Sequence, residues 1–139
     1  DRYATHLLKN VRSSGSGTLE YVYDAEPVER VEMSSENLSA VLAGMHDLAT
    51  DGAVSQYFKD CIVDAAAKTG TVQTGDTKNN NGAFVCFAPY DDPQIAVAIV
   101  IEKGGSGAAL ASTAVQVLNA YFSNTSASSA ITGENTLLG

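Results

Sequence analysis

The chain has 139 residues, 45% of them hydrophobic and 17% charged, which is typical of a globular protein rather than a disordered or membrane-spanning one. It carries 8 basic and 16 acidic residues, and the resulting net charge of −8 argues against binding to nucleic acid or to anionic lipid. The two cysteines, Cys61 and Cys86, do not make a disulfide framework, so we expect free and mostly buried thiols. His6 and His46 have no ligand-like spacing to the cysteines, and we therefore expect no metal and no cofactor.

The N-terminal region predicts short strands. The serine- and glycine-rich residues 13–17 form a turn signal, and residues 19–23 then alternate apolar and polar side chains, so we expect a hairpin. Residues 24–32 contain Pro27 and four acids, which predicts an exposed connection or a short edge strand. Because no start signal precedes this region, we expect the chain to be a piece of a longer protein.

A helix is predicted over residues 35–50. Ser34 or Ser35 provides its cap. Apolar residues then recur at helical spacing on one face: Leu38, Val41, Leu42, Met45, Leu48 and Ala49. We interpret this as a helix that covers the core, in which Met45 packs against its neighbours and His46 is solvated.

The second half alternates between strands and a helix. Strands are predicted at 63–74, 84–88 and 94–101, followed by a glycine-rich turn and a helix over 108–122. The run 95–101 is apolar on both faces, which predicts a central strand covered by helices on both sides. Together with strand 19–23 these strands would form one antiparallel sheet with helices packed on it. The expected class is therefore α+β.

The segment Ala67-Lys68-Thr69-Gly70-Thr71 is the strongest chemical signal in the chain. In a strand, Lys68 and Gly70 share one face, while Thr69 and Thr71 share the other. A cation, two hydroxyls and accessible backbone N–H groups on one rigid strand suit a carboxylate or a developing oxyanion. The alternative is an ordinary strand with a surface lysine, because a match of three residues alone is weak.

Lys-Thr-Gly is one of three motifs of the serine penicillin-binding proteins and the active-site serine β-lactamases. Further segments, in the same order and spacing, are similar to high-molecular-weight transpeptidases: Arg2 to Leu7, Ser34 to Leu38, Asp51 to Lys59, Asn81 to Tyr90, and Pro93 to Ile101. Residues 1–122 thus resemble the C-terminal part of a class B penicillin-binding transpeptidase domain. Residues 123–139 would be a polar, loosely ordered tail.

This resemblance implies the sheet half of a β-lactamase/transpeptidase-like fold, and it implies roles for individual residues. Lys68 would supply positive potential toward the substrate carboxylate and the proton-relay network. Thr69 and Thr71 would offer hydroxyls to that carboxylate, with Gly70 leaving room beside the strand. The backbone N–H of Thr71 would be one of two oxyanion-hole donors.

The resemblance also implies a cellular setting. The parent protein would be a serine D,D-transpeptidase that acts on peptidoglycan stem peptides and is acylated by β-lactams. It would be membrane-anchored and would act on the extracytoplasmic face of the bacterial membrane. The missing N-terminal part of the same protein would complete the domain, and no cofactor is implied.

The first family motif, Ser-x-x-Lys, is absent, since no serine of the chain has a lysine three residues later. Ser35-Glu36-Asn37 matches the second motif, Ser-x-Asn, but it lies at a helix start, where capping explains it. We therefore expect the chain alone to be inactive. Two alternatives stay open: a serine β-lactamase or β-lactam sensor, and a non-catalytic extracytoplasmic binding domain of the same fold.

Overall fold

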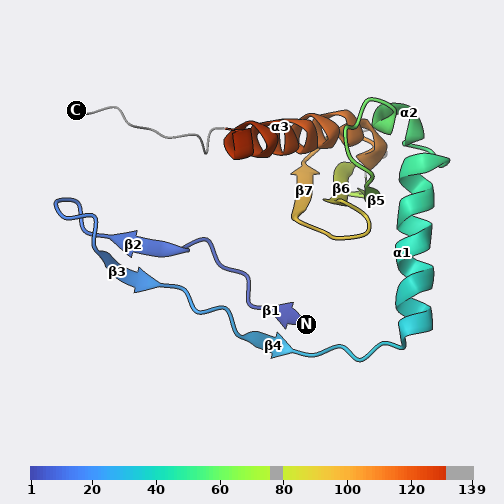
Figure 1. Ribbon diagram of the computed structural model, residues 1–139. Coiled ribbons are helices and arrows are strands. Elements are labelled where there is room, and N and C mark those ends of the chain that lie inside the picture. The colour runs from blue at the N-terminus through green and yellow to red at the C-terminus, as the bar shows by residue number, and fades with distance from the viewer. Residues whose placement is uncertain (76–79, 131–139) are drawn as a thin grey trace. The chain divides into compact units, whose positions relative to one another are not determined.

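The computed structural model describes residues 1–75 and 80–130, which form two compact units, one ending at Asn37 and the other beginning at Leu38 (Figure 1). Each unit is considered by itself. In this part of the chain, none of the helices combines the length and the apolar character that a membrane span requires.

The first unit consists of two small antiparallel sheets. β1 (Arg2–Tyr3) pairs with β4 (Pro27–Glu29), and β2 (Asn10–Arg12) pairs with β3 (Leu19–Val22). The predicted hairpin and the short strand within 24–32 are therefore confirmed. The prediction that strand 19–23 joins the main sheet is wrong, because β3 finds its partner across the tight turn and all four of its residues are exposed.

The second unit is built on a three-stranded antiparallel sheet of order β5-β6-β7. The strands are β5 (Ala66–Val72), β6 (Asn81–Ala88) and β7 (Ile95–Ile101). β5 is shorter than the predicted strand 63–74, and β6 begins earlier than predicted. Antiparallel sheets with separate helices confirm the α+β class.

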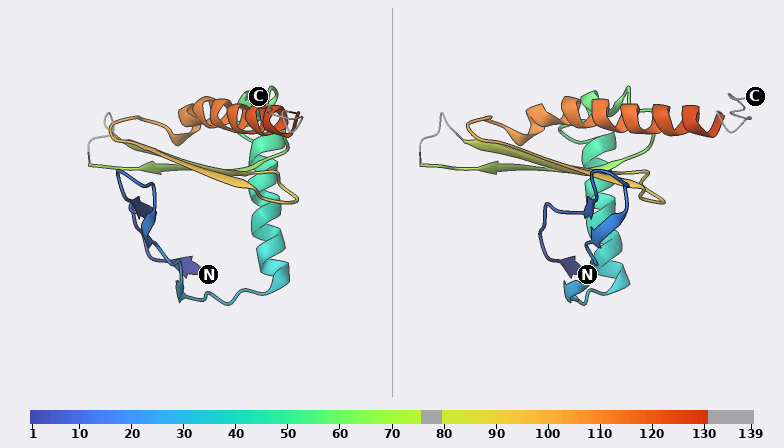
Figure 2. Two further views of the ribbon diagram at one scale, coloured as in Figure 1. Left: turned by 60° about the vertical axis from the view of Figure 1, so that its left-hand side comes forward. Right: turned by 90° about the vertical axis from the view of Figure 1, so that its left-hand side faces the viewer.

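One face of this sheet is covered by η1 (Gly107–Leu110) and α3 (Ala111–Ala130), as Figure 2 shows. The buried side chains between sheet and helix include Ala67, Phe84, Cys86, Leu110, Ala111, Ala114 and Leu118. The predicted helix 108–122 therefore begins as a 3₁₀ turn and continues past Phe122 to Ala130. The rest of the predicted tail lies outside the described residues.

β7 is an edge strand among the described residues rather than the predicted central one. Its residues alternate, with Ile95, Val97 and Ile99 half-buried and Ala96, Ala98 and Val100 exposed. An all-apolar sequence shows that a strand can be buried on both faces, but it does not determine how many strands pair with it in the sheet. The prediction of helices covering both faces fails because Ala96, Ala98 and Val100, which share one face of β7, are exposed.

α1 (Ser35–Thr50) matches the predicted helix, and the Ser34 hydroxyl accepts a hydrogen bond of 3.2 Å from the Asn37 backbone N–H. This cap satisfies one of the free N–H groups at the helix start. Met45 is half-buried and lines a hollow of about 210 Å³ with residues of β6 and β7, so it packs as expected. The short helix α2 (Ser55–Phe58) was not predicted.

Both cysteines are free thiols, as the sequence predicts. Burial raises the pKa of the Cys86 thiol to about 11, and burial likewise raises the pKa of Cys61. Because the thiolate is the reactive form, neither cysteine is an activated nucleophile at neutral pH.

Asn119 fastens α3 to the segment between α2 and β5. Its side-chain amide donates to the Asp60 carbonyl at 2.9 Å, and its side-chain oxygen accepts from the Ile62 N–H at 2.9 Å. One carboxamide thereby satisfies two backbone groups of a chain segment that leads into β5.

Replacing Asn119 should lower the stability of the second unit. Asn119→Ala removes both hydrogen bonds, and we expect the free energy of unfolding to fall by about 1–2 kcal/mol, as measured by urea denaturation. Gln116→Ala is the matched control, because Gln116 is an exposed carboxamide on the same helix. Equal destabilisation by both substitutions would contradict this role of Asn119.

Candidate active site

The Lys-Thr-Gly segment lies in β5, at the edge of the three-stranded sheet. Lys68 is paired with Val85 and Gly70 with Ala83, so these four residues share one face of the sheet, which we call the lysine face. Farther along, that face continues over Ala98 and Val100 of β7.

Thr69 is paired with Phe84 and Thr71 with Gly82, on the opposite face. Phe84 is buried under α3, so we call this side the α3 face. The structure thus has the alternation that the sequence predicts. The lysine and the two threonines lie on one strand but on different faces.

The Lys68 side chain is exposed, and its Nζ donates a hydrogen bond of 2.6 Å to the carbonyl oxygen of Thr69. Within residues 1–75 and 80–130 it forms no ion pair with an acidic side chain. A hollow of about 200 Å³ adjoins it, lined by Lys68, Thr69, Gly70, Ala83, Phe84 and Val85. The cation therefore stands beside a hollow, and no carboxylate of the described residues neutralises it.

The outer side of β5 carries backbone groups that β6 does not use. β5 has one neighbour among the described residues, so half of its N–H and C=O groups point away from the sheet. Thr69 is half-buried and Thr71 is exposed. Preorganised N–H donors beside a cation are the chemical requirement for stabilising a carboxylate or an oxyanion.

On the α3 face of the sheet, the backbone of η1 lies close to the backbone of Gly70. A Cβ added to Gly107 of η1 would lie 2.9 Å from the Gly70 backbone nitrogen, and still closer to the carbonyl oxygens of Gly70 and Ala83. The backbone of η1 therefore rests directly on the Gly70–Ala83 pair. The room that the sequence predicts beside Lys68 lies on the other face, where a Cβ added to Gly70 would meet only Ala83, at 3.4 Å, so the contact with Gly107 was not predicted.

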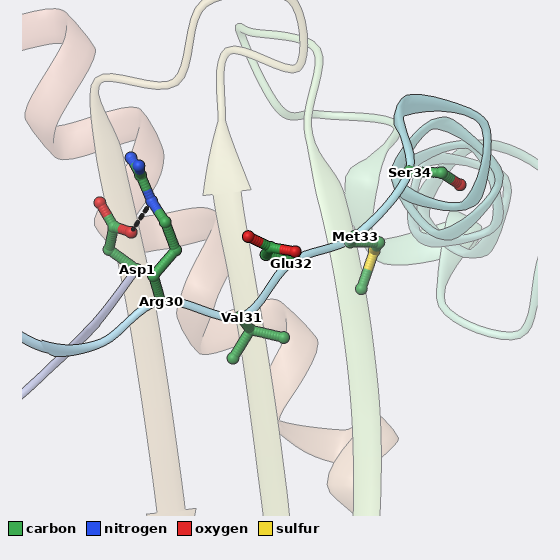
Figure 3. Close-up of a pocket in the computed structure, with 6 residues that line it drawn as sticks. All are labelled: Asp1, Arg30, Val31, Glu32, Met33 and Ser34. Carbon is green, nitrogen blue, oxygen red and sulfur yellow. Dashed lines mark hydrogen bonds and ion pairs between the residues drawn. The ribbon is translucent and has the colours of Figure 1, made fainter.

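A larger hollow, of about 660 Å³, lies in the first unit (Figure 3). Its lining consists of Asp1, Arg30, Val31, Glu32, Met33 and Ser34. Asp1 and Arg30 neutralise each other at 3.0 Å, and the Ser34 hydroxyl caps α1. This hollow contains no nucleophile paired with a base, and volume alone does not make it a catalytic site.

The sequence pattern did not predict the contacts that His46 makes with Asp64 and Tyr90. His46 Nε2 lies 2.9 Å from both carboxylate oxygens of Asp64, and the His46 ring stacks on Tyr90 at a centroid distance of 4.3 Å. The prediction that His46 is solvated is therefore wrong. In the described part of the chain, no three His, Cys, Asp or Glu side chains gather in a way that could hold a metal ion.

The family model of the penicillin binding protein transpeptidase domain matches residues 1–122. Penicillin-binding protein 2A of Bacillus subtilis is 32% identical over 113 residues, which cover 72% of this chain and 16% of that protein. The peptidoglycan D,D-transpeptidase MrdA of Escherichia coli K12 is 33% identical over 92 residues, which cover 55% of this chain and 14% of that protein. The chain thus spans about a seventh to a sixth of the length of these relatives.

Solved structures agree with this match. Pseudomonas aeruginosa PBP2, solved in complex with WCK 5153, is similar with a TM-score of 0.60 and 31% identity, over 76% of this chain and 24% of that one. The fold and the sequence therefore identify the same relatives, which are PBP2-type proteins of class B. The chain belongs to the family of penicillin-binding protein transpeptidase domains.

Proposed function

We propose that this chain supplies the Lys-Thr-Gly strand to the active site of a peptidoglycan D,D-transpeptidase. The observation that carries the proposal is the position of the motif, on the edge strand of a sheet in a domain of this family. The B. subtilis and E. coli relatives are longer proteins, and the chain corresponds to 16% and 14% of their lengths. The nucleophilic serine would be contributed by residues outside this sequence.

In the proposed reaction, a serine hydroxyl attacks the carbonyl carbon between the last two residues of a D-alanyl-D-alanine stem peptide. The C–N bond breaks, the terminal D-alanine leaves with a proton, and an acyl-serine ester forms. An amine of a neighbouring strand then attacks the ester, which forms the crosslinking amide and regenerates the serine. A β-lactam would imitate the donor peptide and acylate the same serine.

The residues of β5 would bind and orient the substrate and stabilise its negative charge, and they would form no covalent bond with it. Lys68 would face the substrate carboxylate, and this role is supported by its exposed side chain, which has no acidic partner in residues 1–75 and 80–130. The Thr71 N–H would donate to the oxyanion, and Thr69 or Thr71 would reach the carboxylate over the strand edge. Because Lys68 and the threonines lie on opposite faces, we propose that not all three side chains contact the substrate at once.

We further propose that the enzyme acts outside the cytoplasmic membrane, where peptidoglycan is crosslinked, and that the full-length protein is membrane-anchored. The D,D-transpeptidase name of the E. coli relative supports peptidoglycan as substrate. Completion of the site by a further part of the same protein would provide the Ser-x-x-Lys motif, which these 139 residues lack.

The isolated chain should not react with penicillin. Because no serine here has a lysine three residues later, no activated nucleophile is present. After incubation with a labelled penicillin, intact-mass spectrometry should find the unmodified mass, while the full-length protein under the same conditions gains one adduct. A stoichiometric adduct on any serine of the isolated chain would refute the assignment.

Lys68→Ala in the full-length protein should slow penicillin acylation by about 10²–10³-fold, because loss of one preorganised electrostatic contact has this typical effect. Lys68→Arg should retain more activity, since the charge survives. The melting temperature should change little, because the Lys68 side chain is exposed. Stopped-flow or gel-based labelling with a fluorescent penicillin would measure the rates.

Lys59→Ala is the matched control, since Lys59 is also an exposed lysine of the second unit but lies outside the motif. It should be acylated at the wild-type rate. If Lys68→Ala is also acylated at that rate, or loses activity only in proportion to its unfolded fraction, Lys68 is an ordinary strand residue.

A further inference from the structure

The turn after β7 is held firmly against the start of β6. The Lys103 N–H donates to the Asn81 side-chain oxygen at 2.9 Å, and the Gly105 N–H donates to the Asn80 carbonyl at 2.9 Å. Lys103 and Gly105 have positive φ values of 55° and 75°, which turn the chain sharply back toward the sheet. These contacts define where η1 can begin.

η1 then crosses the α3 face directly behind the Lys-Thr-Gly segment. Ser106 caps it, since its hydroxyl accepts from the Ala108 N–H at 3.2 Å. A Cβ on Gly82 would lie 3.4 Å from the Ser106 carbonyl group and 3.5 Å from the Gly107 nitrogen. Because Gly82 is the cross-strand partner of Thr71, the start of η1 lies against the Thr71 pair as well as the Gly70 pair.

Gly107 makes the closest of these approaches. The atoms that an added Cβ would meet are the Gly70 nitrogen and the carbonyl oxygens of Gly70 and Ala83, and all of them are backbone atoms. No side-chain rotation can relieve such an overlap, so either η1 or β5 would have to move. Gly44, by contrast, has nothing within 4 Å of an added Cβ.

We propose that Gly107 is a positioning residue for the active-site strand. The absence of a side chain at Gly107 lets the backbone of η1 lie against Gly70 and so fixes the backbone of β5 from behind. The outer edge of Thr69-Gly70-Thr71 is thereby held in the position in which its N–H groups would meet the substrate. The catalytic importance of Gly107 rests on the proposed function, because the position of β5 governs a reaction rate only if β5 belongs to an active site.

The test uses three glycine-to-alanine variants of the full-length protein. Gly107→Ala should displace the strand edge by roughly 1 Å and slow penicillin acylation by about 10²-fold, since misplacements of this size have such effects. Gly82→Ala, whose added Cβ has looser contacts with the same segment, should slow acylation by a smaller factor. Gly44→Ala should react like the wild type.

Rate and final labelling must be measured separately. A displaced strand lowers the rate constant but still allows every molecule to be acylated, whereas misfolding lowers the labelled fraction at the endpoint. We expect full endpoints for Gly82→Ala and Gly107→Ala. A wild-type rate constant for Gly107→Ala would overturn the proposal, and so would a variant that loses only part of its final labelled fraction. If Gly107→Ala does not fold, the proposal is overturned by a wild-type rate constant for Gly82→Ala.

Hydrogen exchange separates this proposal from the proposed function. The peptide that contains residues 66–72 should exchange faster in Gly107→Ala than in the wild type, and unchanged exchange would refute the positioning role. If the wild-type protein is not labelled by penicillin, the proposed function fails, and exchange alone decides whether Gly107 positions β5. If labelling is normal and Gly107→Ala changes neither rate nor exchange, only the role of Gly107 fails.

Discussion

The register between β5 and β6 is the constraint on which the candidate site depends. Backbone pairing from Ala66–Phe87 to Val72–Asn81 determines the face on which every side chain of the motif lies. A slip of one residue would carry Lys68 to the α3 face, where η1 and α3 would desolvate its charge at high cost. Ala67, which is 0% exposed on that face, opposes such a slip because it would have to leave the core.

The same strand passes from the core to the solvent within a few residues. Ala65, Ala66 and Ala67 are buried, whereas Lys68 and Thr71 are exposed. The small alanines allow close packing around the start of β5, where α3 is also tied to the preceding segment by Asn119. β5 is therefore anchored at its beginning and supported by η1 at Gly70, while no strand of the described residues pairs with its outer edge. A rigid strand with an open edge is suited to holding donors in a fixed geometry.

Local patterns predicted the features that depend on local physics. The alternation of β5, the hairpin before Val22 and the Ser34 cap all follow from side-chain periodicity or from hydrogen bonds across a few residues. The edge position that β7 has among the described residues could not be predicted, because hydrophobicity does not record the number of neighbouring strands. The contact of His46 with Asp64 joins residues 18 positions apart in the sequence, and neither residue type signals the other. Gly107 shows the same limit, since its importance arises from Gly70 and Ala83, which are distant in sequence.

Within the described residues, the one hydrogen bond that the Lys68 side chain makes suits the role proposed for it. Its Nζ donates to the Thr69 carbonyl, a neutral acceptor on the adjacent residue. A substrate carboxylate would offer a charged acceptor, and charge-assisted hydrogen bonds are roughly twice as strong as neutral ones. The exchange of one acceptor for the other would move only the flexible end of the lysine, because β6 and η1 hold the backbone. The proposed site would therefore bind an anion with little reorganisation of the strand, which is the condition under which a fixed charge contributes most to catalysis.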